Sequence, residues 1–303
     1  MAGLTFSLVF GFSFLFSKEA LDIIAPFHLL GFRFLAASLV ITILSFMKVI
    51  KTNFTGKSIK PLMIISIFQP FLYFTFEILG INFTTSSQAG LMISLIPVAT
   101  AVLGAIFLGE VPGWKQSLCI ILSVLGVGLV VTAQGDIGSQ AHYLGIIFLL
   151  GAVISGGAYN IISRSISVDY TPVEITFFMC YSGAVLFNLL GIIRFEGAIS
   201  TYSSYLFNTQ VMISVIYLST LSSILAFFML NYALSRLPAS QASVFANLTT
   251  VVSILAGVLI RGEPFYAIQA WGALLIIIGV WGTNYFELRS DDNPEISKNL
   301  QKE

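Results

Sequence analysis

A stretch in the first half of this 303-residue chain recurs in the second half, at a fixed distance of 153 residues. Ser87-Gln88-Ala89 returns as Ser240-Gln241-Ala242, and Gly109-Glu110 returns as Gly262-Glu263. Apolar matches arise easily in so apolar a chain, whereas matched glutamine, glutamate and glycine at one offset do not. The sequence therefore predicts one structural unit that is used twice.

The unit is predicted to consist of membrane helices. Hydrophobic residues make up 57% of the chain and charged residues 9%, whereas an ordinary soluble domain carries roughly 25% charged residues. So few charges cannot cover a soluble surface, so lipid is the expected solvent. About 20 consecutive apolar residues span a bilayer as a helix. Segments of this kind occupy residues 3–22, 27–47, 61–82, 86–108, 114–133, 143–163, 172–193, 210–233, 239–260 and 266–286.

These segments predict an all-α integral membrane protein with ten transmembrane helices. Each half holds five of them, and an odd number of crossings places the second copy upside down relative to the first. We therefore expect two inverted five-helix repeats, over residues 3–133 and 143–286. Residues 287–303 are polar and mixed in charge, and they are predicted to form a disordered cytoplasmic tail.

The distribution of basic residues predicts the orientation in the cell membrane. Ten lysines and arginines lie on the side that would hold both termini, against three on the other side, Lys18, Arg194 and Arg261. Because cytoplasmic loops are enriched in basic residues, both termini are expected in the cytoplasm.

Several function classes find no support in the sequence. The formal net charge is zero, so nothing indicates a nucleic-acid partner. Phosphate-binding, metalloprotease and nucleophile-elbow motifs do not occur, and Cys119 and Cys180 lack the spacing of a metal or redox site. We therefore expect no catalytic residues, no metal and no cofactor, and the chain is interpreted as a non-enzyme.

Polar side chains inside the predicted spans are the candidates for a functional site, because their burial in hydrocarbon is costly. Glu77 lies in the third span and is a candidate for binding substrate or a coupled proton. Arg33 and Lys18 lie at a similar depth, and either is expected to form an ion pair with Glu77. Such a pair would also serve simply to lock helices together, and both interpretations stay open.

Further polar or helix-breaking residues are spread over both halves. Gln69 and Tyr73 share a face of the third span, Pro97 lies near the middle of the fourth, and Asn160 and Asn247 lie in the sixth and ninth. Proline in mid-span leaves a backbone carbonyl without its helical partner. This distribution is the one that a binding site at the midplane between two repeats requires.

Three stretches resemble the EamA-type members of the drug/metabolite transporter superfamily. They are Arg33-Phe34-Leu35-Ala36-Ala37, the segment Gly80-Ile81-Asn82-Phe83-Thr84-Thr85-Ser86 followed by Pro97, and the paired Gly109-Glu110 and Gly262-Glu263. The resemblance implies ten helices in two inverted repeats around a central cavity. It makes Glu77, Tyr73, Asn160 and Asn247 candidate contacts of the substrate. It also implies that Glu110 and Glu263 cap helix ends and join the repeats.

Together these observations predict a secondary transporter that exports or exchanges small organic solutes, such as amino acids, metabolites or drug-like compounds, by alternating access. Its partners are the lipid bilayer and a small-molecule substrate, with proton coupling and uncoupled transport both open, as are a monomer and a homodimer. The alternatives are a membrane-embedded enzyme acting on a lipid-linked substrate, and a channel or scaffold subunit that transports nothing.

Overall fold

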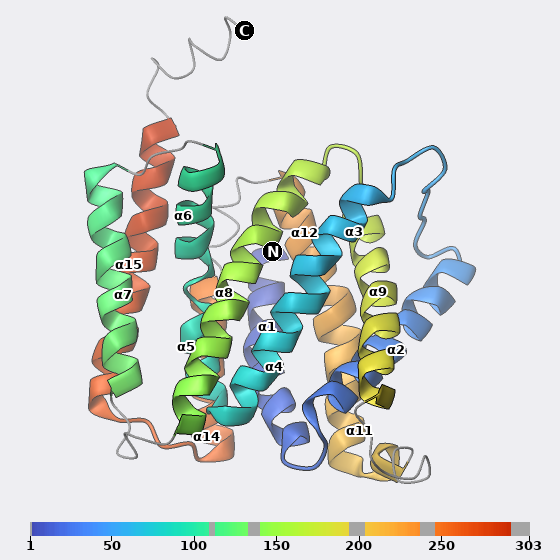
Figure 1. Ribbon diagram of the computed structural model, residues 1–303, viewed down its shortest axis with the longest axis horizontal. Coiled ribbons are helices and arrows are strands. Elements are labelled where there is room, and N and C mark those ends of the chain that lie inside the picture. The colour runs from blue at the N-terminus through green and yellow to red at the C-terminus, as the bar shows by residue number, and fades with distance from the viewer. Residues whose placement is uncertain (1, 109–112, 133–139, 194–203, 237–245, 292–303) are drawn as a thin grey trace, which may run out of the picture.

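Helices make up all the regular structure of the residues that the computed structural model describes, which are 2–108, 113–132, 140–193, 204–236 and 246–291. They run roughly side by side as a bundle (Figure 1). In chain order they are α1 (Ala2–Leu21), α2 (Pro26–Phe46), α3 (Lys60–Ser66), η1 (Ile67–Leu72), α4 (Tyr73–Phe83), α5 (Ser86–Ile93), α6 (Ile96–Leu108), α7 (Trp114–Thr132), α8 (Gln140–Ile166), α9 (Pro172–Ile193), η2 (Tyr205–Phe207), α11 (Thr209–Ile216), η3 (Tyr217–Ala226), α12 (Phe227–Arg236), α14 (Ala246–Arg261) and α15 (Ala267–Asp291).

Seven helical segments in the described residues are long and apolar enough to cross a membrane. They are Ala2–Leu21, Pro26–Phe46, Lys60–Phe83, Ser86–Phe107, Gln140–Ile166, Pro172–Ile193 and Thr209–Arg236. Three shorter apolar helices, Trp114–Val130, Leu248–Arg261 and Ala267–Thr283, occupy the other predicted spans. The prediction of an all-α membrane protein is confirmed, while the count of ten crossings stays a prediction.

The outer surface of the bundle is apolar, as lipid requires. Large side chains such as Phe46, Ile106, Phe107 and Ile192 are mostly exposed, at 67–82% of their surface. In water such a surface would drive aggregation, whereas in a bilayer it costs nothing.

The end of α15 differs from the sequence-based expectation. The helix continues to Asp291, so residues 287–291 are helical and do not belong to a disordered tail. No proline or glycine follows Gly282 until Pro294, so nothing in the sequence stops the helix at residue 286. The remainder of the predicted tail, 292–303, lies outside the described residues.

Three of the long spans are interrupted near their middles. In the third span, η1 contains Gln69 with non-helical angles (φ −150°, ψ 117°), directly before Pro70. The fourth span breaks at Ser94 and Leu95, so that Pro97 lies in the first turn of α6, where its missing N–H costs nothing. In the eighth span, η3 is a π-helical segment of ten residues. Interruptions of this kind in membrane helices are typical of functional sites.

Helices from the two halves of the chain pack against each other in pairs. The most extensive contacts join α7 with α15, α2 with α9, α4 with α8, and α1 and α5 with α14. Figure 1 shows α7 and α15 together at one edge of the molecule, with α2 and α9 toward the other. Small residues allow the close approach, because a Cβ atom at Gly126 would lie 2.7 Å from the Gly272 carbonyl oxygen.

Candidate functional site

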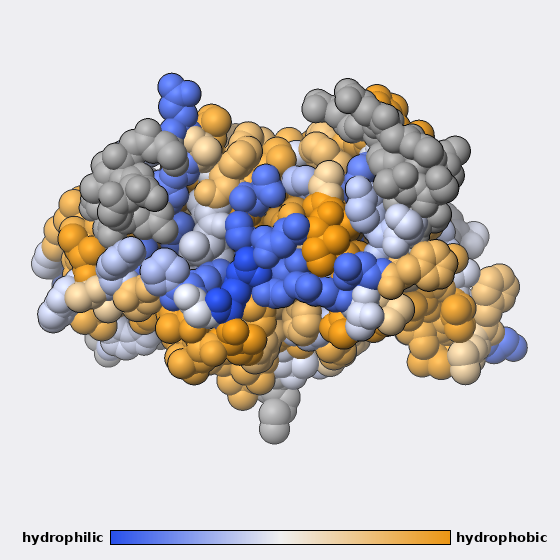
Figure 2. Space-filling model, turned by 90° about the horizontal axis from the view of Figure 1, so that it is seen from below, coloured by the Kyte–Doolittle hydropathy of each residue, from blue (hydrophilic) through white to orange (hydrophobic). Residues whose placement is uncertain are grey.

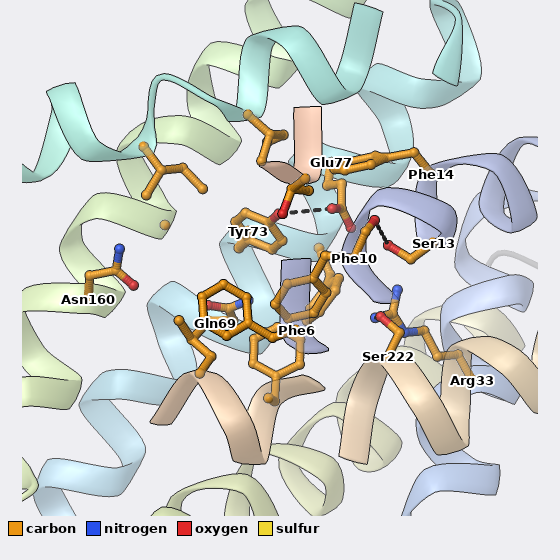
Figure 3. Close-up of a pocket in the computed structure, with 17 residues that line it drawn as sticks. Phe6, Phe10, Ser13, Phe14, Arg33, Gln69, Tyr73, Glu77, Asn160 and Ser222 are labelled. Carbon is orange, nitrogen blue, oxygen red and sulfur yellow. Dashed lines mark hydrogen bonds between the residues drawn. The ribbon is translucent and has the colours of Figure 1, made fainter. Parts of the chain in front are cut away.

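A cavity lies at the centre of the bundle. Its walls come from both halves of the chain. Its polar lining consists of Ser13, Arg33, Gln69, Tyr73, Glu77, Asn160, Ser222 and Thr249 (Figure 3).

One wall of the cavity is aromatic. Phe6, Phe10 and Phe14 from α1 lie with Phe74 of α4 and Phe227 of α12 along it. The rings of Phe10 and Phe227 meet edge to face with centroids 4.9 Å apart, and those of Phe74 and Phe227 with centroids 5.7 Å apart. Such contacts hold the rings in place and leave an apolar surface for part of a ligand.

Arg33 brings a buried positive charge to the cavity. Its side chain is 2% exposed. Its Nε donates to the Ser223 hydroxyl at 2.8 Å and its Nη2 to the Ser222 hydroxyl at 3.0 Å. The guanidinium carbon also lies 4.4 Å from the centre of the Phe74 ring. All these partners are neutral, so the charge is solvated by dipoles and a π face rather than by an anion.

Glu77 brings an acidic group to the same cavity. It is 5% exposed, and its Oε1 accepts a hydrogen bond of 2.9 Å from the hydroxyl of Tyr73, one turn earlier in α4. Figure 3 shows both side chains on the cavity wall, joined by this bond.

The predicted ion pair of Glu77 is absent. No nitrogen of Arg33 or Lys18 lies within 4.0 Å of its carboxylate in the described part of the chain. Lys18 instead donates to the carbonyl oxygens of Ile81 and Asn82, at 2.9 and 3.2 Å. These carbonyls belong to the last turn of α4, and that of Ile81 also accepts from the Thr84 N–H at 3.3 Å. Arg33 is held by η3, almost 200 residues away in sequence.

The other predicted contacts divide into three groups. Gln69 and Asn160 line the cavity, Gln69 from the interruption in η1 and Asn160 from α8. Pro97 is buried in α6 but does not line the cavity, although its neighbour Ile96 does. Asn247 belongs to α14, but its side chain lies outside the described residues, and Glu110 lies outside them altogether.

Sequence reasoning missed several lining residues, among them Ser13, Ser222 and Thr249. Serine and threonine are common in membrane helices and carry little signal on their own. Ser222 does sit in the same run as Ser219 and Ser223, and this polar run within an apolar span was the signal available.

A polar group, here called the end cluster, consists of Glu19, Asp22, Gln210 and Arg261. Arg261, the last residue of α14, donates from Nη1 to Glu19 at 2.5 Å and from Nη2 to Asp22 at 2.6 Å. Gln210 of α11 donates from its amide nitrogen to the other carboxylate oxygen of Glu19, Oε2. Figure 2 shows this end of the molecule, with hydrophilic residues gathered at the centre and apolar residues around them.

Glu263 lies beside the end cluster and caps α5. Its Oε1 accepts from the backbone N–H and the hydroxyl of Ser86, at 2.9 and 2.8 Å. Its Oε2 accepts from the same groups of Ser87, at 2.9 and 2.6 Å. Burial alone would raise the pKa of Glu263, but these four hydrogen bonds outweigh it and hold the pKa below its ordinary value. The carboxylate thus satisfies the N-terminus of a helix from the other half of the chain.

The cavity and the end cluster lie at different depths. The last cavity residue of α1 is Phe14, five residues before Glu19, which is about 7.5 Å along the helix axis. In α14 the cavity residue is Thr249, twelve residues before Arg261. The end cluster therefore lies beyond the cavity, toward the ends of α1 and α14.

The fold and site define a multi-pass membrane protein that holds a polar and aromatic cavity between helices from both halves of its chain. The family model for the EamA-like transporter family matches residues 1–132 and 143–285. The chain belongs to this family, and its resemblance to EamA-type transporters is confirmed.

Individual relatives are transporters by name. The chain is 32% identical over 287 residues to the uncharacterized transporter YcxC of Bacillus subtilis (strain 168), covering 94% of this chain and 92% of that protein. It is 25% identical to a probable amino-acid metabolite efflux pump of Escherichia coli (strain K12), covering 93% of each. It is 26% identical to a probable terminal-alkyne amino-acid exporter of Streptantibioticus cattleyicolor, covering 64% of this chain and 63% of that protein.

A solved crystal structure shares the fold. Its chain superimposes with a TM-score of 0.71 at 16% sequence identity, covering 96% of this chain and 98% of that one. At this identity the likeness shows the fold alone.

Proposed function

We propose that this protein is a secondary transporter that moves small organic solutes across the cell membrane by alternating access. The observation that carries the proposal is the central cavity, which holds charged, polar and aromatic side chains at the depth where three membrane spans are interrupted. Irregular backbone at membrane depth is tolerated where it lines a cavity, and carriers bind their substrates there.

Alternating access requires that one end of the cavity be closed while the other is open. The end cluster supplies such a closure, because Arg261 of α14 bridges Glu19 and Asp22 at the end of α1. Partly exposed ion pairs are each worth only about 0.2–1 kcal/mol. A closure of this strength holds one state and still opens within a transport cycle.

The two halves, residues 3–133 and 143–286, are proposed to form the moving units, inverted relative to each other. The pairing of helices supports this proposal. The second span packs on the seventh (α2 with α9), and the fifth packs on the tenth (α7 with α15). The third span packs on the sixth (α4 with α8), and the first span packs on the eighth (α1 with η3). A two-fold axis that exchanges the two halves converts the first of these contacts into the second.

The excess of basic residues on one side supports a cytoplasmic location for both termini. The end cluster would then face outward, and the cavity would be closed toward the outside. Labelling single cysteines near the two ends of the chain in intact cells checks this orientation. Reaction of either end with a membrane-impermeant reagent would contradict it.

Amino acids and related metabolites are the proposed substrates, and export is the proposed direction. Two relatives with amino-acid export in their names support this choice. A proton is the proposed coupling ion, with Glu77 as its carrier, because this residue supplies the carboxylate that lines the cavity in the described part of the chain.

Counterflow in proteoliposomes tests the proposal. Vesicles loaded with unlabelled amino acid should take up the labelled compound transiently and saturably, since a carrier exchanges one bound solute for another. A channel would conduct in planar bilayers without counterflow, and a scaffold or an enzyme would show neither, so any of these results would reject the proposal.

Coupling is tested separately with Glu77→Gln. If Glu77 carries the proton, the variant loses transport driven by a pH gradient but keeps exchange of solute for solute when the solute is saturating. Unchanged gradient-driven transport would exclude Glu77 as the coupling group. Lys57→Gln is the matched control, because Lys57 pairs with Glu174 at 2.7 Å outside the cavity.

A further inference from the structure

The cavity presents one positive and one negative side chain that do not pair with each other. Arg33 and Glu77 both line it, yet their charged groups stay more than 4.0 Å apart. The two groups therefore do not form the direct ion pair that would lock α2 to α4. The two opposite charges thus face one cavity without direct contact, each open to a ligand group of its own.

Each of the two groups keeps part of its hydrogen-bonding capacity unused. Within the described residues, the hydrogen bonds of Arg33 use Nε and Nη2, so Nη1 is available to an acceptor. Glu77 receives its one hydrogen bond, from Tyr73, at Oε1, so Oε2 is available to a donor. Both residues are more than nine-tenths buried, and Figure 3 shows them directed into the cavity.

The chemistry of these free positions defines a complementary ligand. A guanidinium binds a carboxylate with strong, directional hydrogen bonds. A carboxylate with a free oxygen binds an ammonium group. The aromatic wall of Phe6, Phe10 and Phe14 suits an apolar side chain, and it offers no further charge.

We infer that Arg33 binds the α-carboxylate and Glu77 the α-ammonium of a zwitterionic amino acid whose apolar side chain rests on the aromatic wall. This inference rests on the proposed transport function, and it assigns the recognition of both charges to residues of the first half of the chain. The hydroxyls of Ser222 and Ser223 act as positioning groups, because they hold the guanidinium through Nε and Nη2 and leave Nη1 toward the ligand.

Binding of three related compounds to the purified protein tests the inference. L-phenylalanine carries both charges, phenethylamine lacks the carboxylate, and 3-phenylpropionate lacks the ammonium. Hydrogen bonds to charged groups contribute enough that wild-type protein should bind L-phenylalanine at least about tenfold more tightly than either analogue. Isothermal titration calorimetry in detergent measures all three.

Two variants assign the charges to their residues. Arg33→Gln should weaken L-phenylalanine about tenfold and leave phenethylamine unchanged, because the analogue has no carboxylate to lose. Glu77→Gln should weaken L-phenylalanine similarly and leave 3-phenylpropionate unchanged. Lys57→Gln, outside the cavity, should change none of the three affinities, and Arg33→Lys should retain part of the preference for L-phenylalanine over phenethylamine.

The comparison of compounds on wild-type protein needs no variant, so a variant that fails to fold does not remove the test. Equal binding of phenethylamine and L-phenylalanine, or no binding of L-phenylalanine, would overturn the inference. An equal loss of phenethylamine binding in Arg33→Gln would do the same. Counterflow of a solute without these charges would leave the transport function standing while this substrate class is rejected.

Discussion

Replacing Glu263 by alanine removes the acceptor of the first two N–H groups of α5. In the wild-type protein its two oxygens receive four hydrogen bonds, two from backbone N–H groups and two from the hydroxyls of Ser86 and Ser87. The hydroxyls can rotate toward other acceptors, but the N–H groups are fixed by the helix. Both serines are almost completely buried, at 0% and 2% exposure.

The cost of the substitution follows from those two N–H groups. A buried donor left without a partner costs about 1–3 kcal/mol, so two give about 2–6 kcal/mol. Glu263 itself is 8% exposed, so water can reach part of the vacated site. We therefore expect a loss of about 3 kcal/mol, in the lower half of that range. The variant Glu263→Gln retains one oxygen acceptor and should lose about half as much.

Denaturation in mixed micelles, followed by tryptophan fluorescence, measures the change in free energy of unfolding. Glu19→Gln is the matched control, because it removes a carboxylate from the end cluster that is paired but partly exposed. It should cost no more than about 1 kcal/mol. If Glu263→Ala and Glu19→Gln are equally stable, the cap does not contribute as its geometry indicates.

Three further outcomes are expected. Because the pKa of Glu263 is lowered in the folded protein, its carboxylate stabilises the fold fully above the ordinary value of 4.5, and this stabilisation is lost as the pH falls through the lowered pKa. Glu263→Gln should therefore lose less stability on acidification than the wild-type protein. Gly11→Val should lower the melting temperature and the yield of folded protein, because even a Cβ there would lie 2.5 Å from Val252 and 3.0 Å from the Thr249 carbonyl oxygen. Arg261→Gln should open the end cluster and increase the labelling of a cysteine placed at Ser13, in a chain without its native cysteines, by an impermeant thiol reagent added from outside.

Each of these outcomes has a result that contradicts it. An acid-induced loss of stability that is the same with glutamine at position 263 would remove this carboxylate from the explanation. Normal melting of Gly11→Val would mean that α1 and α14 are less closely packed than the structure has them. Unchanged labelling in Arg261→Gln would show that the end cluster does not close the cavity. Gly113→Ala serves as the control for Gly11→Val, because no atom lies within 4 Å of a Cβ placed there.

The positions of the membrane helices were predictable because the required property is local. A run of apolar residues long enough to cross a bilayer is visible in the sequence, and the predicted 172–193 agrees with α9 (Pro172–Ile193). The predicted 27–47 lies within one residue of α2 (Pro26–Phe46). The interruptions at Gln69 and within η3 were not predicted, since helical and π-helical segments share the same apolar composition.

The candidate site was predictable only in part. The predicted residues Glu77, Tyr73, Gln69 and Asn160 line the cavity, because polar groups in an apolar span avoid lipid and point inward. Their role in binding substrate stays a prediction. Their relations to other residues were not identified. The sequence favoured an ion pair of Glu77 with Arg33 or Lys18, whereas Arg33 bonds to neutral groups in η3 and Lys18 to carbonyls of α4.

The sequence by itself determined the solvent, the helical class and the family, because composition, span length and repeated motifs do not depend on how distant segments meet. The tertiary structure decided which polar groups face one cavity, which charges remain unpaired and which helix end Glu263 satisfies. Those outcomes depend on contacts between residues up to about 240 positions apart, such as Arg261 with Glu19. In a bilayer every helix surface is similarly apolar, so hydropathy cannot select these contacts, and shape and hydrogen bonding must.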